Sequence, residues 1–166
     1  MRAPRLFTAA VLLVICAAPA LAATDDPYET LKAMDGRWIA TTSHGRTQTV
    51  ENHCARTGLF FACEQVVGGK PAALVVFLPK EIGGHRLVFH TQTLTAAGDR
   101  PGPWRELIID AGRWTYSGLD KSQRGERRLR TVDTYSGPDF MHAETQTSAN
   151  GETWTTLASE DLNRAP

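Results

Sequence analysis

The stretch Met34-Asp35-Gly36-Arg37-Trp38 separates two kinds of sequence in this chain of 166 residues. Before it, Leu31 and Met34 lie three residues apart, which gives the short apolar stripe of a small helix. Gly36 ends that helix, because glycine adopts the backbone conformations that commonly follow a helix. From Trp38 onward the sequence has the pattern of short strands between turns. We therefore expect a short N-terminal helix followed by an all-β domain.

The first 22 residues have the features of a secretory signal peptide. Arg2 and Arg5 give a positive start, and residues 6–18 form an almost unbroken apolar run. Ala20-Leu21-Ala22 then has the small-x-small pattern of a signal-peptidase site. The run is short for a permanent membrane anchor, so an uncleaved anchor is the weaker alternative. We expect a signal peptide over 1–22 and a periplasmic or secreted domain over 23–166.

Charge and hydropathy exclude several kinds of partner. Removal of Arg2 and Arg5 from the 18 basic residues leaves 16 against 18 acidic ones, a net charge of −2. This balance gives no general attraction to nucleic acid or to an anionic membrane surface. No stretch after the signal sequence is apolar enough to cross a bilayer, so we expect no stable membrane insertion after cleavage.

Short segments separated by Gly or Pro fill the rest of the chain. Asn150-Gly151 is the strongest turn signal, because a type I′ turn needs positive φ at both central residues. Near-neighbour connections between so many strands favour a single up-and-down antiparallel β-barrel of about 8–10 strands. A two-sheet sandwich is the alternative. The expected strands cover 37–43, 46–55, 59–67, 71–78, 85–94, 104–110, 113–117, 126–135, 139–148 and 153–163.

The last hairpin predicts which side chains face the barrel interior. A two-residue turn at Asn150-Gly151 pairs Thr147 with Trp154. Because side chains alternate along a strand, Trp154 then shares a face with Met141 and Ala143. A face that carries these apolar residues is the better candidate for the interior.

The preceding hairpin can be placed on the same face. A three-residue loop over 136–138 pairs Leu129 with Thr145 and leaves Arg128 and Arg130 in solvent. A shift by one residue would bury both arginines, and burial of unpaired charge costs several kcal/mol. The preferred register turns four polar residues inward: Arg127, Thr131, Asp133 and Tyr135.

Cys54 and Cys63 are the only cysteines outside the signal sequence. A tight turn between them places the two residues opposite each other, and an exported protein meets an oxidising compartment, so we expect a disulfide. The same register turns Asn52 and Gln65 inward. No other cysteine or histidine pair has the spacing of a zinc site, and we expect neither a metal nor a cofactor.

The inward polar residues form the candidate site, because a few polar groups in an apolar cavity orient a small ligand. Asp133 and Tyr135 are also candidates for acid–base catalysis if burial shifts their pKa values. A structural hydrogen-bond network between two strands is the alternative. The expected ligand contacts are Asn52, Gln65, Arg127, Thr131, Asp133, Tyr135 and Trp154.

Gly36-Arg37-Trp38 resembles the Gly-x-Trp motif that opens the first strand of lipocalins and related calycin barrels. In that superfamily an arginine from the end of the barrel packs across the tryptophan, and the resemblance assigns this role to Arg164. The chain also resembles an uncharacterised family of exported bacterial lipocalin-like proteins. This second resemblance rests on Phe140 to Glu144, on the Asn-Gly-x-x-Trp turn at 150–154 and on the terminal arginine. The further lipocalin motifs are absent.

These observations predict an exported barrel that binds a small, partly apolar molecule. The first alternative is a calycin-fold enzyme, an isomerase, cyclase or hydrolase, that uses Asp133 and Tyr135. The second is a structural or interaction module with a filled interior. The fold by itself does not choose among them, because one fold carries many functions.

Overall fold

The computed structural model describes residues 26–83, 86–98, 101–122 and 125–166. The expected signal peptide over 1–22 lies outside these residues. Ten strands and one short helix make up most of the described chain. They are η1 (Thr30–Met34), β1 (Gly36–Thr42), β2 (Thr47–Thr57), β3 (Phe60–Val67), β4 (Lys70–Gly83), β5 (Arg86–Thr95), β6 (Arg105–Asp110), β7 (Arg113–Ser122), β8 (Gly125–Tyr135), β9 (Phe140–Ser148) and β10 (Thr155–Arg164).

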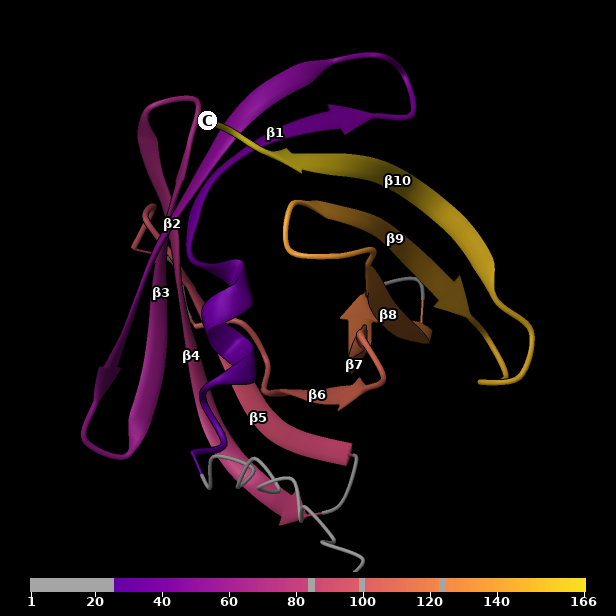
Figure 1. Ribbon diagram of the computed structural model, residues 1–166. Coiled ribbons are helices and arrows are strands. Elements are labelled where there is room, and N and C mark those ends of the chain that lie inside the picture. The colour runs from indigo at the N-terminus through magenta and orange to yellow at the C-terminus, as the bar shows by residue number, and fades with distance from the viewer. Residues whose placement is uncertain (1–25, 84–85, 99–100, 123–124) are drawn as a thin grey trace, which may run out of the picture.

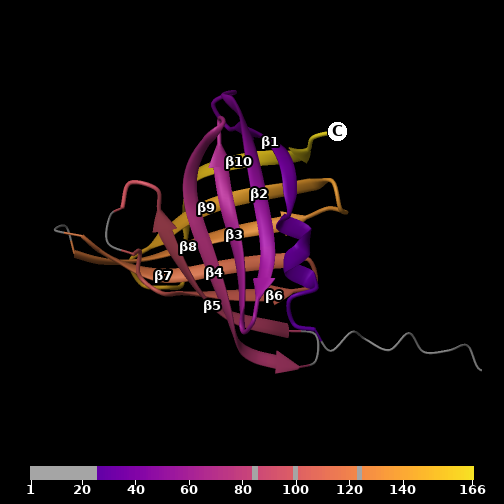
Figure 2. The ribbon, with the colours of Figure 1, turned by 90° about the vertical axis from the view of Figure 1, so that its left-hand side faces the viewer.

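The strands form one closed antiparallel barrel. Each strand pairs with the strands that precede and follow it in the chain, and β1 pairs with β10 to close the sheet (Figure 1). In Figure 2 the strands β2–β5 run across the direction of the strands β8–β10, so opposite walls of the closed barrel cross each other at a large angle. The expected up-and-down barrel is therefore confirmed, and the sandwich alternative is wrong.

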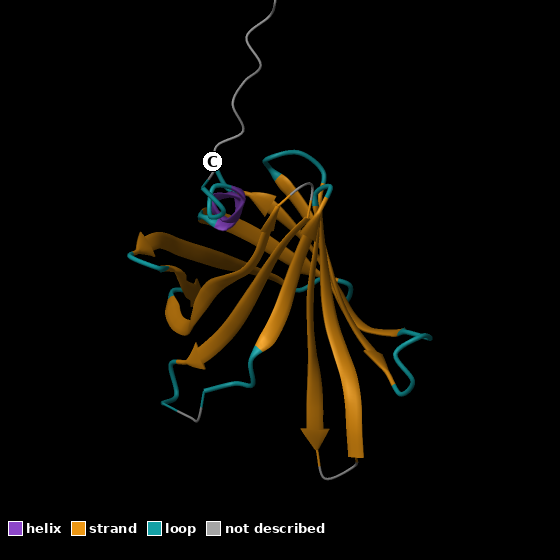
Figure 3. Ribbon diagram, turned by 90° about the horizontal axis from the view of Figure 1, so that it is seen from below, coloured by secondary structure: helices purple, strands orange, loops and turns teal. Residues whose placement is uncertain are grey.

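The expected N-terminal helix is a single 3₁₀ segment, η1, rather than an α-helix. Leu31 and Met34 lie on one side of it, because a 3₁₀ helix has about three residues per turn. The backbone N–H of Asp35 then donates to the carbonyl of Lys32 and ends the segment. Figure 3 shows η1 beside the C-terminal end of the chain, where it covers one end of the barrel.

Strands β4 and β7 are longer than the sequence predicts. The predicted β4 ends at Leu78, before Pro79, but a bulge between Pro79 and Glu81 lets the pairing with β5 continue. The predicted β7 ends at Ser117, before a glycine. Gly118 stays in the strand because the side chain of Arg105 packs over it, and a Cβ there would lie 3.1 Å from the Cγ of Arg105.

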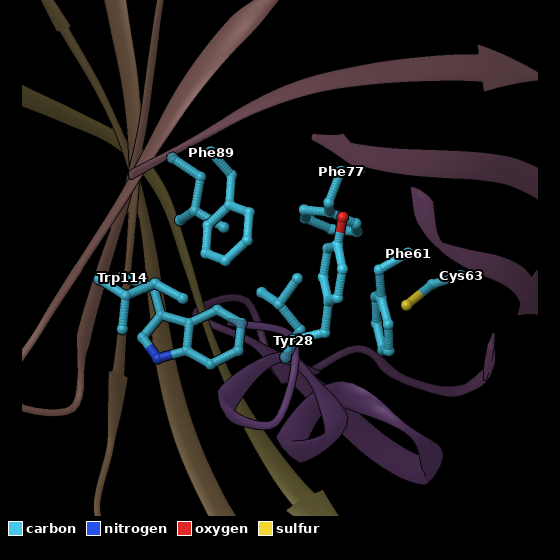
Figure 4. Close-up of a cluster of buried hydrophobic side chains, with 9 residues drawn as sticks. Tyr28, Phe61, Cys63, Phe77, Phe89 and Trp114 are labelled. Carbon is cyan, nitrogen blue, oxygen red and sulfur yellow. The ribbon is translucent and has the colours of Figure 1, made fainter. Parts of the chain in front are cut away.

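Aromatic side chains fill the end of the barrel that η1 covers (Figure 4). Tyr28 stacks on Phe61 with 5.8 Å between ring centroids, and Phe61 meets the edge of Phe77 at 6.1 Å. The Tyr28 hydroxyl donates to the carbonyl of Leu59 in the β2–β3 turn. Buried Leu31 of η1 belongs to the same cluster. Hydrophobic packing therefore closes this end, and the polar part of the interior lies beyond the cluster, farther from the end that η1 covers.

The predicted register of the β2–β3 hairpin is confirmed. Cys54 lies opposite Cys63 and the two form a disulfide, with Asn52 opposite Gln65 on the same face. The bond closes a ring with a sequence separation of 9 residues. In the loop-entropy model such a ring contributes roughly 2.5–3 kcal/mol to stability.

The β8–β9 pairing is shifted by two residues from the prediction. Leu129 lies opposite Thr147 rather than Thr145, because five residues, 136–140, separate the paired Tyr135 and Met141, two more than in the expected three-residue loop. A shift by two residues keeps every side chain on its predicted face. Thr131, Asp133 and Tyr135 therefore still face the interior.

The predicted position of Trp154 is wrong. Thr147 pairs with Thr155, and Trp154 lies before β10, where the guanidinium of Arg130 stacks on its ring at 4.0 Å. The turn is longer than two residues because Asn150 Oδ1 accepts the backbone N–H groups of Glu152 and Thr153. A bulge between Thr156 and Ala158 then returns β10 to its predicted faces.

Candidate ligand-binding cavity

A cavity of about 380 Å³ lies inside the barrel, above the aromatic cluster. A second cavity of about 310 Å³ extends it toward the turn between β1 and β2, and the two share Thr131, Ala143 and Glu160. The walls combine apolar and polar side chains. The apolar ones are Met34, Trp38, Val50, Cys63, Val67, Val75, Phe77, Met141, Ala143 and Leu162, and the polar ones are Gln48, Asn52, Gln65, Thr91, Thr93, Arg105, Tyr116, Thr131, Asp133, Tyr135 and Glu160.

The structure brings five of the seven expected ligand contacts together in this cavity: Asn52, Gln65, Thr131, Asp133 and Tyr135. The other two, Arg127 and Trp154, do not line it. Arg127 has the same alternation as Asp133 but lies nearer the start of β8, where it is exposed. Trp154 packs against Arg130 outside the barrel. A direct ligand contact for any of the seven residues stays a prediction.

Two amide side chains are fixed on the wall formed by β2 and β3. The Asn52 Nδ2 group donates to the carbonyl of Met34 at 3.1 Å, and Gln65 Nε2 donates to Asn52 Oδ1 at 3.4 Å. Because η1 provides the accepting carbonyl, the covered end of the barrel also sets the orientation of these amides. Both residues line the cavity, where the side-chain carbonyl oxygen of Gln65 can accept a hydrogen bond from a ligand.

Trp38 lines the cavity at the point where the barrel closes. It lies opposite Arg164, whose guanidinium stacks on the indole at 4.3 Å, as the calycin resemblance predicts. Arg164 also donates to three carbonyls, those of Ala33 at 3.0 Å, Asp35 at 2.8 Å and Pro138 at 3.1 Å. One side chain therefore ties the last strand to η1 and to the β8–β9 connection.

Gly36 makes room for this arginine. Its φ of +103° lies outside the range that other residues readily adopt, and a Cβ there would lie 2.8 Å from Arg164 Nη1. We expect Gly36→Ala to lower the free energy of unfolding by about 1–3 kcal/mol in urea denaturation. Gly45→Ala is the matched control, because Gly45 has φ +74° with nothing within 4 Å of the added Cβ. An equal loss in both variants would mean that Gly36 is needed only for its backbone.

Two carboxyl groups face the cavity from β8 and β10. Burial and, to a smaller extent, the charge of Glu160 raise the pKa of Asp133 to about 7. Burial also raises the pKa of Glu160. The two phenols beside them change in the same direction: burial raises the pKa values of Tyr116 and Tyr135, and the charge of Asp133 adds to both effects.

Sequence reasoning did not identify Glu160, Tyr116 and Arg105 as cavity residues. Each lies two residues from a buried residue on its own strand and therefore shares the inward face with it. The pairs are Glu160 with Leu162, Tyr116 with Trp114, and Arg105 with Leu107. This pattern could have identified all three.

The described residues contain no group of three or more His, Cys, Asp or Glu side chains that could hold a metal ion. In the described part of the chain, no helix is long and apolar enough to span a membrane. A comparison with known protein families finds no family model that matches this chain, and a comparison with curated proteins finds no match either.

Proposed function

We propose that this protein is an exported carrier that binds a small, partly apolar molecule inside its barrel. The observation that carries the proposal is the interior cavity of about 380 Å³. This volume lies within the range of roughly 300–1,000 Å³ that is typical of small-molecule sites. The disulfide between Cys54 and Cys63 is compatible with export.

The lining of the cavity also supports a small ligand. Trp38 and Phe77 provide apolar contact area, and hydrophobic burial is non-directional, so it supplies affinity without fixing an orientation. Asn52 and Thr131 add polar groups on separate walls, from β2 and β8. Such a mixture suits a molecule with an apolar body and a few polar atoms.

Native mass spectrometry of protein purified without denaturation tests the proposal directly. We expect a bound small molecule that is released when the protein is unfolded. A fluorescence titration with N-phenyl-1-naphthylamine, a neutral apolar probe, provides the quantitative arm. Ala143→Phe should abolish binding of the probe, because Ala143 is buried and lines the cavity. Ala55→Phe, at an exposed position on β2, should leave it unchanged. Equal binding by both variants would rule out the interior as the binding site.

A second candidate function is acid–base catalysis on a ligand in the same cavity. The pKa of about 7 lets Asp133 exchange a proton near neutral pH, and Tyr135 lines the same cavity two positions along β8. A substrate screen of Asp133→Asn beside the wild type separates the two functions. Equal turnover in the two proteins would exclude Asp133 as the acid or base.

A further inference from the structure

Two carboxyl groups face the cavity without a partner from the described chain. Asp133 of β8 and Glu160 of β10 both line it, and neither forms a hydrogen bond or ion pair with any residue. Asp133 keeps part of its surface open to the cavity and is otherwise enclosed by protein. An enclosed carboxyl group without a donor from the chain is costly, so a ligand that supplies a donor would offset that cost at Asp133.

The surroundings of the two carboxyl groups are anionic or aromatic. Glu160 is close enough for its charge to raise the pKa of Asp133, so ionisation of both leaves two negative charges that repel each other. Tyr116 and Tyr135 flank Asp133, and neither phenol donates a hydrogen bond to it. Arg105 of β6 lines the main cavity, four strands away from β10 around the barrel. The extension that Glu160 also lines carries exposed Arg46 and His44. None of the three forms an ion pair with either carboxyl group.

We propose that the ligand carries a protonated amine on an apolar body and that Asp133 and Glu160 hold the amine. This inference rests on the proposed function and specifies the ligand class. An ammonium group has three donors and a positive charge, so it satisfies both carboxylates and removes their repulsion. The rings of Trp38, Tyr116 and Tyr135 line the same cavity and provide faces that attract a cation.

Other ligand charges fit the cavity less well. A neutral hydroxyl can satisfy one carboxylate but leaves the repulsion between the two. A divalent cation needs more ligands than two carboxylates provide, and no third His, Cys, Asp or Glu joins them among the described residues. An anionic group would meet two like charges beside Arg105 of the cavity and exposed Arg46 of its extension.

Calorimetric titration at pH 8 with three matched probes tests the amine. The probes are octylamine, octan-1-ol and octanoate, which share an apolar chain and differ in the charge of the head group. We expect the wild type to bind octylamine most tightly. Asp133→Asn keeps the shape of the side chain and should weaken octylamine binding about ten- to a hundredfold, as expected for a lost hydrogen bond to a charged group. The affinity for octan-1-ol should change by less than about threefold.

Two further variants complete the experiment. Glu160→Gln should weaken octylamine binding in the same direction as Asp133→Asn. Asp110→Asn changes the net charge by the same amount at an exposed position at the end of β6, and it should leave all three affinities unchanged. Binding of octan-1-ol by each variant also shows that its cavity is intact.

The possible outcomes distinguish this inference from the proposed function. If octan-1-ol binds as tightly as octylamine, or if Asp133→Asn weakens the binding of both equally, the inference of an amine ligand is wrong. The proposed function, binding of a small molecule inside the barrel, is then still supported. If octanoate binds most tightly, an arginine, Arg105 or Arg46, is the charged contact and the inference of an amine is again wrong. If no probe binds, the proposed function and the amine fail together.

Discussion

Trp38→Ala is expected to lower the free energy of unfolding by about 3–5 kcal/mol, the typical cost of truncating a large buried aromatic side chain. Trp38 is 1% exposed and packs with Ala40, Val50 and Leu162. Its Nε1 group donates to the carbonyl of Met34 at 3.1 Å, so the variant also removes one of the two donors to that carbonyl, the other being Asn52 Nδ2. Urea denaturation at fixed pH, with the disulfide intact, measures the loss.

Part of the expected cost arises because Arg164 depends on the indole. The guanidinium stacks on the ring while it donates to the carbonyls of Ala33, Asp35 and Pro138. Without the ring one face of the guanidinium has no contact, and the junction of β1 and β10 opens toward the cavity. Arg164→Lys should show part of the same loss, because an ammonium group cannot keep the planar fork that reaches three carbonyls.

Trp104→Ala is the matched control. Trp104 is 51% exposed and lies immediately before β6, so its removal should cost less than about 1 kcal/mol. If Trp38→Ala also cost less than about 1 kcal/mol, the Gly-x-Trp resemblance would be accidental and the contact with Arg164 would not hold the barrel closed.

The barrel could be predicted from local signals that agree with one another. Glycines separate the strands, and the opposed positions of Cys54 and Cys63 give one register directly. The contact between Trp38 and Arg164 could be predicted only through the calycin resemblance. The alternation of side chains along β10 gives the face on which Arg164 lies, but it does not say which residue of β1 lies opposite.

The errors come from side chains that act on the backbone. Asn-Gly at 150–151 predicts a two-residue turn, but the Asn150 side chain accepts two backbone N–H groups and widens it. The resulting shift moves Trp154 out of the barrel. The bulge that follows then restores the predicted faces of β10, so the error stays local.

For the candidate site, the sequence predicts which side chains face the interior, but it does not predict how far along the strand each one lies. Arg127 and Asp133 have the same alternation on β8, yet they lie about 20 Å apart along a strand at roughly 3.3 Å per residue. Only Asp133 reaches the level of the cavity. The depth to which η1 and its aromatic cluster fill the barrel sets that level, and this depth depends on packing among residues distant in the sequence.

Asp133→Asn is expected to stabilise the unliganded protein at pH 8 and to have little effect at pH 4. Burial raises the pKa of Asp133 to about 7, whereas an unfolded aspartate has a pKa of about 3.9. Between these values the native state binds more protons than the unfolded state, so the stability of the wild type falls as the pH rises through this window. At roughly 1.4 kcal/mol per pH unit, and with some relief from water in the cavity, the loss is about 2–4 kcal/mol.

Denaturation at pH 4, 6 and 8 measures this dependence, with Asp110→Asn as the exposed control of equal charge change. Glu160 faces Asp133 from β10 and its pKa is also raised, so a smaller slope of the same sign should remain in the Asp133→Asn protein. Tyr116 and Tyr135 have pKa values above 10 and do not titrate in this range. A stability gain that is the same at pH 4 and pH 8 would show that Asp133 is not a buried, unpartnered acid. The expected gain at pH 8 would instead show that Asp133 lowers the stability of the empty barrel. Such a cost is typical of residues that are retained for ligand binding.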